Sequence, residues 1–69
     1  ETPYILQFDY TQMNEVMIIV KQLNCSVQQQ EMNLFCRLVI GIPRGRLDEA
    51  LYKFGDLRGV EITPVRPVA

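Results

Sequence analysis

Hydrophobic and polar residues alternate at the start of the chain, over residues 4–10. Successive side chains of a strand point to opposite faces, so a strand here places its large apolar side chains together. These side chains are Tyr4, Leu6, Phe8 and Tyr10. The pattern therefore predicts a first strand over residues 4–10, with Pro3 tolerated only at its beginning.

Two later segments have a helical period instead. Apolar side chains recur every three or four residues, first at Met13, Val16, Met17, Val20 and Leu23, then at Leu47, Ala50, Leu51 and Phe54. Each set forms one stripe of an amphipathic helix. Thr11 is the predicted N-cap of the first helix and Asn24 its predicted end. Gly55 is the predicted C-terminal cap of the second helix.

Three more strands are predicted around these helices. Residues 27–31 are polar, residues 34–42 are apolar in seven of nine positions, and residues 60–63 alternate. A hairpin centred near Met32–Asn33 joins the first two of them, because Asn tolerates positive φ. Pro43 ends the apolar strand, and Pro64 ends the last one.

The resulting order of elements is β-α-β-β-α-β, which predicts an α+β, ferredoxin-like fold in a single domain, residues 1–69. The four-stranded antiparallel sheet is expected in the order 4-1-3-2, with both helices on one face. The apolar strands then lie in the centre and the polar or proline-ended strands at the edges. The predicted inward side chains are Leu6, Phe8, Cys36, Leu38, Ile40, Val60 and Ile62.

The composition restricts the chemistry that this domain can perform. The chain has 69 residues, with seven Lys/Arg and eight Asp/Glu, no histidine, and Ser26 as its one serine. This excludes histidine-based acid/base catalysis, a Ser–His triad, a strongly basic nucleic-acid module and most zinc sites. We expect no enzyme activity, no cofactor, no metal and no membrane span. Because the sequence begins with Glu1, we expect it to be part of a longer protein.

The two cysteines are expected to be free. The predicted hairpin places Cys36 opposite Gln29, which leaves Cys25 about 13 Å away along the strand. A disulfide needs Cα atoms within about 7 Å. Cys36 is predicted to be buried, and free thiols are typical of a reducing, cytoplasmic location.

Positive charge is concentrated in the second half of the chain. Arg37 and Arg66 lie there, together with the four basic residues predicted below to bind RNA phosphates. Residues 41–46 favour a strand end followed by the start of a helix, where backbone N–H groups attract anions. The residues predicted to bind RNA phosphates are Arg44, Arg46, Arg58 and Lys53.

The sheet face away from the helices is the second candidate surface. An RNA-recognition sheet presents aromatic residues on its central strands, and here Phe35 is the one aromatic residue on that face. The mixture of Ile5, Phe35 and Val39 instead indicates a protein-contact patch.

The residues at several element ends resemble a known family. Asp9-Tyr10, Ile42-Pro43 and Asp56-Leu57-Arg58-Gly59, in this order and spacing, resemble the C-terminal domain of unknown function in YigZ-like proteins of the IMPACT family. The resemblance covers residues 4–63. It implies a ferredoxin-like fold similar to a C-terminal domain of elongation factor G, a nucleic-acid or ligand-binding role, and an IMPACT-type domain as a partner in the same chain. It implies no catalytic residue.

Three classes of function stay open from the sequence. The first is an accessory domain that binds RNA or the ribosome weakly. The second is a regulatory small-ligand domain of the ACT type, although Tyr10-Thr11-Gln12 lacks the glycine usual in its first loop. The third is a structural or self-associating module. We favour them in this order.

Overall fold

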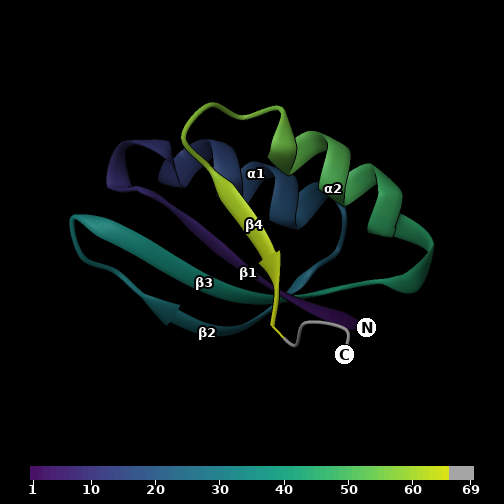
Figure 1. Ribbon diagram of the computed structural model, residues 1–69. Coiled ribbons are helices and arrows are strands. Elements are labelled where there is room, and N and C mark those ends of the chain that lie inside the picture. The colour runs from purple at the N-terminus through teal and green to yellow at the C-terminus, as the bar shows by residue number, and fades with distance from the viewer. Residues whose placement is uncertain (66–69) are drawn as a thin grey trace.

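A computed structural model describes residues 1–65, and the predicted basic residue Arg66 lies outside them. Residues 1–65 form four strands and two α-helices (Figure 1), with a short 3₁₀ turn before each helix. The elements are β1 (Thr2–Asp9), α1 (Met13–Gln22), β2 (Ser26–Glu31), β3 (Phe35–Ile42), α2 (Leu47–Gly55) and β4 (Glu61–Pro64). The two 3₁₀ turns are η1 (Tyr10–Gln12) and η2 (Arg44–Arg46).

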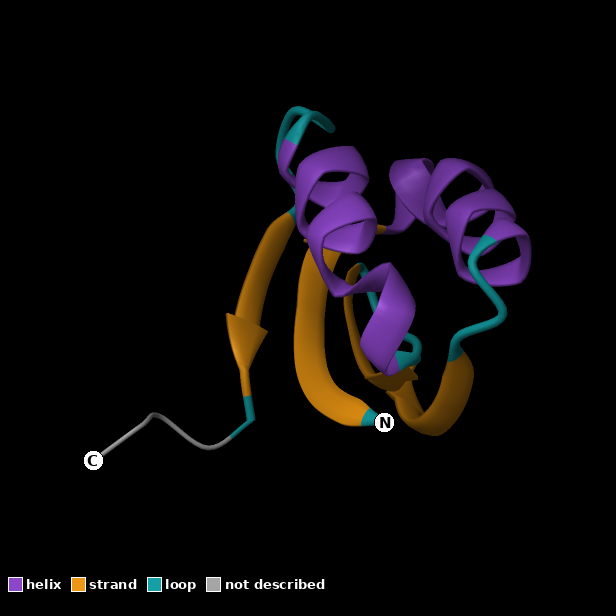
Figure 2. Cartoon of the chain, turned by 90° about the vertical axis from the view of Figure 1, so that its right-hand side faces the viewer, coloured by secondary structure: helices purple, strands orange, loops and turns teal. Residues whose placement is uncertain are grey.

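The sheet is antiparallel throughout its three strand pairs, in the order β2-β3-β1-β4. This is the predicted order read from the other edge. Both helices lie on one side of the sheet (Figure 2), and no helix of residues 1–65 covers the other side. The predicted α+β class is therefore confirmed, and the arrangement is compatible with a ferredoxin-like fold.

The core lies between the helices and the inward face of the sheet. Its fully buried side chains include those predicted from the two periodicities: Leu6, Phe8, Val16, Cys36, Leu38, Ile40, Ala50 and Phe54. Val60 is also buried, and Ile62 packs against the core while half-buried. Leu51 differs from the prediction, because at 36% exposed it lies outside the core that Ala50 and Phe54 enter. Periodicity thus identified the inward faces correctly.

The end of β1 differs from the prediction. Tyr10 was expected in the strand with its side chain inward, but it begins η1 and is 60% exposed. The Thr11 backbone N–H and hydroxyl both donate hydrogen bonds to Asp9 Oδ1, each at 2.9 Å. Asp9 therefore caps η1, because its short carboxylate closes a turn directly after the strand. The predicted cap Thr11 lies inside this turn, and α1 begins after Gln12, whose side chain makes no capping hydrogen bond.

The two helices end differently. Asn24 has φ 56°, and the N–H groups of Asn24 and Cys25 donate to the carbonyls of Lys21 and Val20 at 3.2 and 3.0 Å. This is a Schellman ending, as Asn24 predicted. Gly55 is not a cap: it is the last residue of α2, and Asp56 follows it with helical φ and ψ.

The β2–β3 hairpin is longer than the sequence predicted. Glu31 pairs with Arg37, so the loop is centred on Leu34 rather than on Met32–Asn33. Leu34 is 90% exposed and not part of a strand, and its carbonyl accepts a hydrogen bond from the Tyr10 N–H at 3.1 Å. The loop backbone is thus bonded to the end of β1, which keeps Leu34 out of the ladder with β2.

The register of β3 also places the cysteines. Cys36 pairs with Phe8 of β1, whereas Gln29 pairs with Val39 and not with Cys36. The ladder shifts by one residue between Val27 and Gln29, where β2 bulges. Both thiols are free and Cys36 is buried, as predicted.

Candidate binding surfaces

The structure separates the four basic residues predicted to bind RNA. Arg44 and Arg46 lie in η2 before α2, Lys53 lies in the last turn of α2, and Arg58 follows the helix. The nine residues of α2 extend about 14 Å. Arg58 therefore lies beyond the far end of the helix from the two η2 arginines. The structure brings Arg46 and Lys53 together and leaves Arg58 apart.

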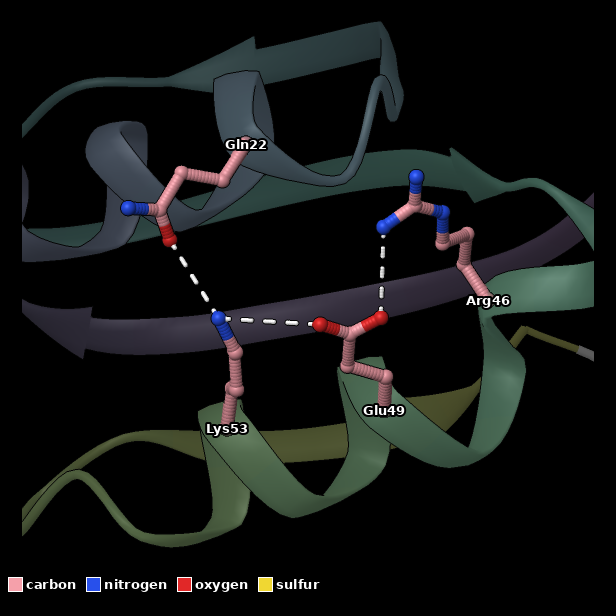
Figure 3. Close-up of polar contacts among 4 residues, drawn as sticks. All are labelled: Gln22, Arg46, Glu49 and Lys53. Carbon is pink, nitrogen blue, oxygen red and sulfur yellow. Dashed lines mark hydrogen bonds and ion pairs between the residues drawn. The ribbon is translucent and has the colours of Figure 1, made fainter.

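Glu49 is the residue that joins Arg46 and Lys53 (Figure 3). Arg46 Nη1 lies 3.3 Å from Glu49 Oε1, and Lys53 Nζ lies 3.7 Å from Glu49 Oε2. Lys53 Nζ also donates a hydrogen bond of 3.5 Å to Gln22 Oε1 of α1. All three charged side chains are partly exposed, so the pairs stabilise the fold little. Their main consequence is that one carboxylate partly offsets two positive charges.

The turn before α2 is the strand end and helix start that the sequence favoured. Pro43 follows β3, and its carbonyl accepts a hydrogen bond from the Arg46 N–H at 2.9 Å. Asp48 and Glu49 occupy the first turn of α2. Acidic side chains there interact favourably with the positive end of the helix, so they compete with an external anion.

The predicted protein-contact patch lies on the open sheet face, which is the face without helices. Ile5 of β1 and Val39 of β3 are directly paired neighbours, and both are half-buried. Phe35 is four residues from Val39 along β3, about 13 Å, and is 55% exposed. The structure thus joins two members of the patch at the centre of the face and places Phe35 at one end.

Three exposed apolar side chains near Phe35 were not predicted from the sequence. Tyr10, Met32 and Leu34 are 60%, 41% and 90% exposed, and they come from the turn after β1 and the β2–β3 loop. Tyr10 and Leu34 were assigned to strands, which hid their exposure. The signal that could have revealed them is Asp9 followed by Thr11, a pair typical of a capped turn.

Among residues 1–65, the pKa values of Cys25 and Asp9 are shifted from their ordinary values. Burial, together with the nearby Glu1 carboxylate, raises the pKa of the Cys25 thiol, which disfavours the reactive thiolate. The hydrogen bonds from Thr11 lower the pKa of Asp9, as they do for many capping carboxylates. Within residues 1–65, no group of three or more Cys, Asp or Glu side chains is arranged to hold a metal ion.

The helices of residues 1–65 are short, with ten residues in α1 and nine in α2. Neither α1 nor α2 combines the length and the apolar character needed to cross a bilayer. Both are amphipathic, with their apolar stripes in the core.

Comparison with known proteins supports the fold and leaves the family open. No family model and no curated protein matches the chain. A solved structure described as "Crystal structure of an hypothetical protein" superposes with a TM-score of 0.82 at 19% identity, over 94% of this chain and 32% of that one. The class defined here is therefore a small α+β domain with one open sheet face. The chain spans about a third of the length of that solved structure.

Proposed function

We propose that this chain is a non-catalytic accessory domain of a longer protein, and that its open sheet face is a protein-interaction surface. The observation that carries the proposal is the pairing of Ile5 with Val39 at the centre of that face, on the side without helices. Apolar side chains placed together outside the core are typical of contact surfaces. The solved structure with this fold, in a chain about three times as long, also favours an accessory role.

The parent protein is a separate part of this proposal. The resemblance to YigZ-like proteins makes an IMPACT-type domain the expected neighbour in the same chain. The complete reading frame tests this directly: an IMPACT-type domain before residue 1 supports the family, and an unrelated domain overturns it. The interaction surface does not depend on that outcome.

Site-specific photo-crosslinking in the parent protein tests the interaction surface. Benzoylphenylalanine is introduced in place of Phe35 on the open sheet face or of Tyr52 on α2, both exposed aromatic residues. We expect defined adducts from position 35, within the parent chain or to another protein, and a much lower yield from position 52. Mass spectrometry identifies the crosslinked peptide. Equal yields from both positions, or none from position 35, would contradict the proposal.

Weak binding of RNA phosphates is the second candidate function. It is favoured by Arg44, which is exposed and makes no ion pair among the residues that the structure describes, beside Arg46 in the same turn. With about two phosphates neutralised, the slope of log affinity against log salt is about −2, and the Kd is about 10⁻⁴ M or weaker. Lys53, which shares Glu49 with Arg46, is a further contact expected from the sequence. Arg58, also predicted from the sequence, lies beyond the other end of α2 and is not part of this site.

Titration of labelled single-stranded and duplex RNA at low and moderate salt tests this second function. We expect Arg44→Ala/Arg46→Ala to abolish the binding and Glu49→Gln to strengthen it several-fold, because that change frees Arg46 and Lys53 from a shared carboxylate. Arg37→Ala is the control, since Arg37 lies on the open sheet face. Binding that is absent at low salt, or equal in all variants, rules out the RNA site.

A further inference from the structure

We infer that the open sheet face binds a basic amphipathic helix of a protein partner. In this arrangement the apolar stripe of the helix contacts Ile5 and Val39, and its Lys and Arg side chains face an acidic rim. The acidic rim is defined as Glu1, Asp9, Glu31 and Glu61. The inference rests on the proposed function, because it names the partner chemistry of the same face.

The strand register orders this face into rows that cross the sheet. One row runs through Gln29, Val39, Ile5 and Thr63, and the next runs through Glu31, Arg37, Gln7 and Glu61. The first row supplies the apolar centre and the second supplies charge at both edges. Asp9 pairs with Phe35 at one end of the face. At the other end of the face, Ser26 pairs with Gly41. Glu1 Oε1 lies there too and accepts a hydrogen bond of 3.1 Å from the Ser26 hydroxyl.

Charge is distributed unevenly between the two sides of the molecule. Among residues 1–65, the open face has one cationic side chain, Arg37, and its Nη1 already lies 3.5 Å from Glu31 Oε1. The other basic side chains of residues 1–65 belong to the helical layer and its loops, where four acidic residues offset all but one of the five positive charges: Lys21, Arg44, Arg46, Lys53 and Arg58. The open face is thus acidic although the whole chain carries a formal charge of only −1. Basic groups are its electrostatic complement.

A shallow hollow beside Val39 suits a long basic side chain. The hollow is lined by Gln29, Gln30, Glu31, Arg37 and Val39. Val39 offers an apolar contact and Glu31 a carboxylate at the rim. A Lys or Arg side chain can lay its methylene stem on Val39 and direct its charge to Glu31, where it shares the carboxylate with Arg37.

The size and charge of the face favour a helix over other occupants. Four strands spaced about 4.8 Å apart are wide enough for one helix of about 10 Å with its flanking side chains. A second copy packed face to face would bring carboxylates against carboxylates. RNA phosphates would meet the same repulsion.

The test starts from a phage-displayed library of helical peptides about 16 residues long. The library is selected for binding to the immobilised 69-residue chain. We expect enrichment of peptides with an apolar stripe flanked by Lys or Arg. One enriched peptide, synthesised and titrated by NMR, is expected to shift the amide signals of Ile5, Gln7 and Val39 more than those of α1 and α2. Absence of enrichment, or shifts confined to the helices, overturns both this inference and the proposed interaction surface.

A pair of charge-reversal variants then isolates the acidic rim. The double substitution Glu31→Lys/Glu61→Lys is expected to lower the affinity for the enriched peptide about tenfold at low salt. Asp48→Lys/Glu49→Lys, which makes the same change on α2, should leave the affinity unaltered. Two results overturn the basic partner but leave the interaction surface standing. In the first, the selected peptides bind the open face but are not enriched in Lys or Arg. In the second, the peptide binds both charge-reversal variants with equal affinity. Dimerisation of the wild type through this face in sedimentation equilibrium also overturns this inference.

Discussion

Phe54→Ala is expected to leave the chain largely unfolded at room temperature. Phe54 is fully buried in the core between α2 and the sheet. Replacing a buried phenylalanine by alanine costs about 3–5 kcal/mol, from the lost apolar burial and the cavity that is left. A single core in a chain of this size supplies only about 3–5 kcal/mol of stability, so this one substitution removes most of it.

Urea titration followed by circular dichroism measures this effect. The matched control is Tyr52→Ala, which removes an aromatic ring from the same helix at a position that is 76% exposed. We expect the control to change the free energy of unfolding by about 0.5 kcal/mol or less. A cooperative Phe54→Ala transition close to that of the wild type would show that this core does not determine the stability.

Gly59→Ala is expected to have the second largest effect, a loss of about 1–2 kcal/mol. Gly59 has φ 84°, a conformation that costs any residue with a Cβ. A Cβ there would also lie 3.1 Å from Gln12 Oε1. Gln12 packs tightly in this place because its Nε2 donates to the Arg58 carbonyl, which joins the turn before β4 to η1. The substitution therefore strains the turn and displaces the amide.

The comparison with Gly55→Ala separates these causes from the general loss of a glycine. Gly55 is the last residue of α2, its φ is not positive, and no atom outside its own helix lies within 4 Å of an added Cβ. Alanine is the better helix former, so we expect Gly55→Ala to be neutral or to stabilise by up to about 1 kcal/mol. Thermal melts of both variants measure the difference. Equal melting temperatures would contradict the role assigned to the Gly59 conformation.

The candidate surfaces were only partly predictable from the sequence. Ile5 and Val39 were assigned to one face by alternation alone, and the register makes them direct neighbours. That Glu49 lies between Arg46 and Lys53 follows from i,i+3 and i,i+4 spacing on a helix. It was missed because the basic residues were considered without the acidic ones between them. The separation of Arg58 from the two η2 arginines follows from the length of the intervening helix α2. It was missed because the basic residues were grouped by charge and not by their positions along the helix.

By itself, the sequence determined the elements, their inward faces and the strand order. These follow from periodicity, because a period of two or of 3.6 residues places Leu38 or Val16 on the buried side wherever the exact ends fall. The tertiary structure decided the features that depend on pairing between distant segments. One is the loop centred on Leu34, whose carbonyl accepts a hydrogen bond from the Tyr10 N–H. Another is the turn at Gly59, where the preceding Arg58 carbonyl accepts a hydrogen bond from Gln12 Nε2. Each depends on a few hydrogen bonds or contacts across the fold or around a turn. The free energy of these contacts is small compared with that of burying the apolar side chains, and it is this burial that the periodic pattern reflects.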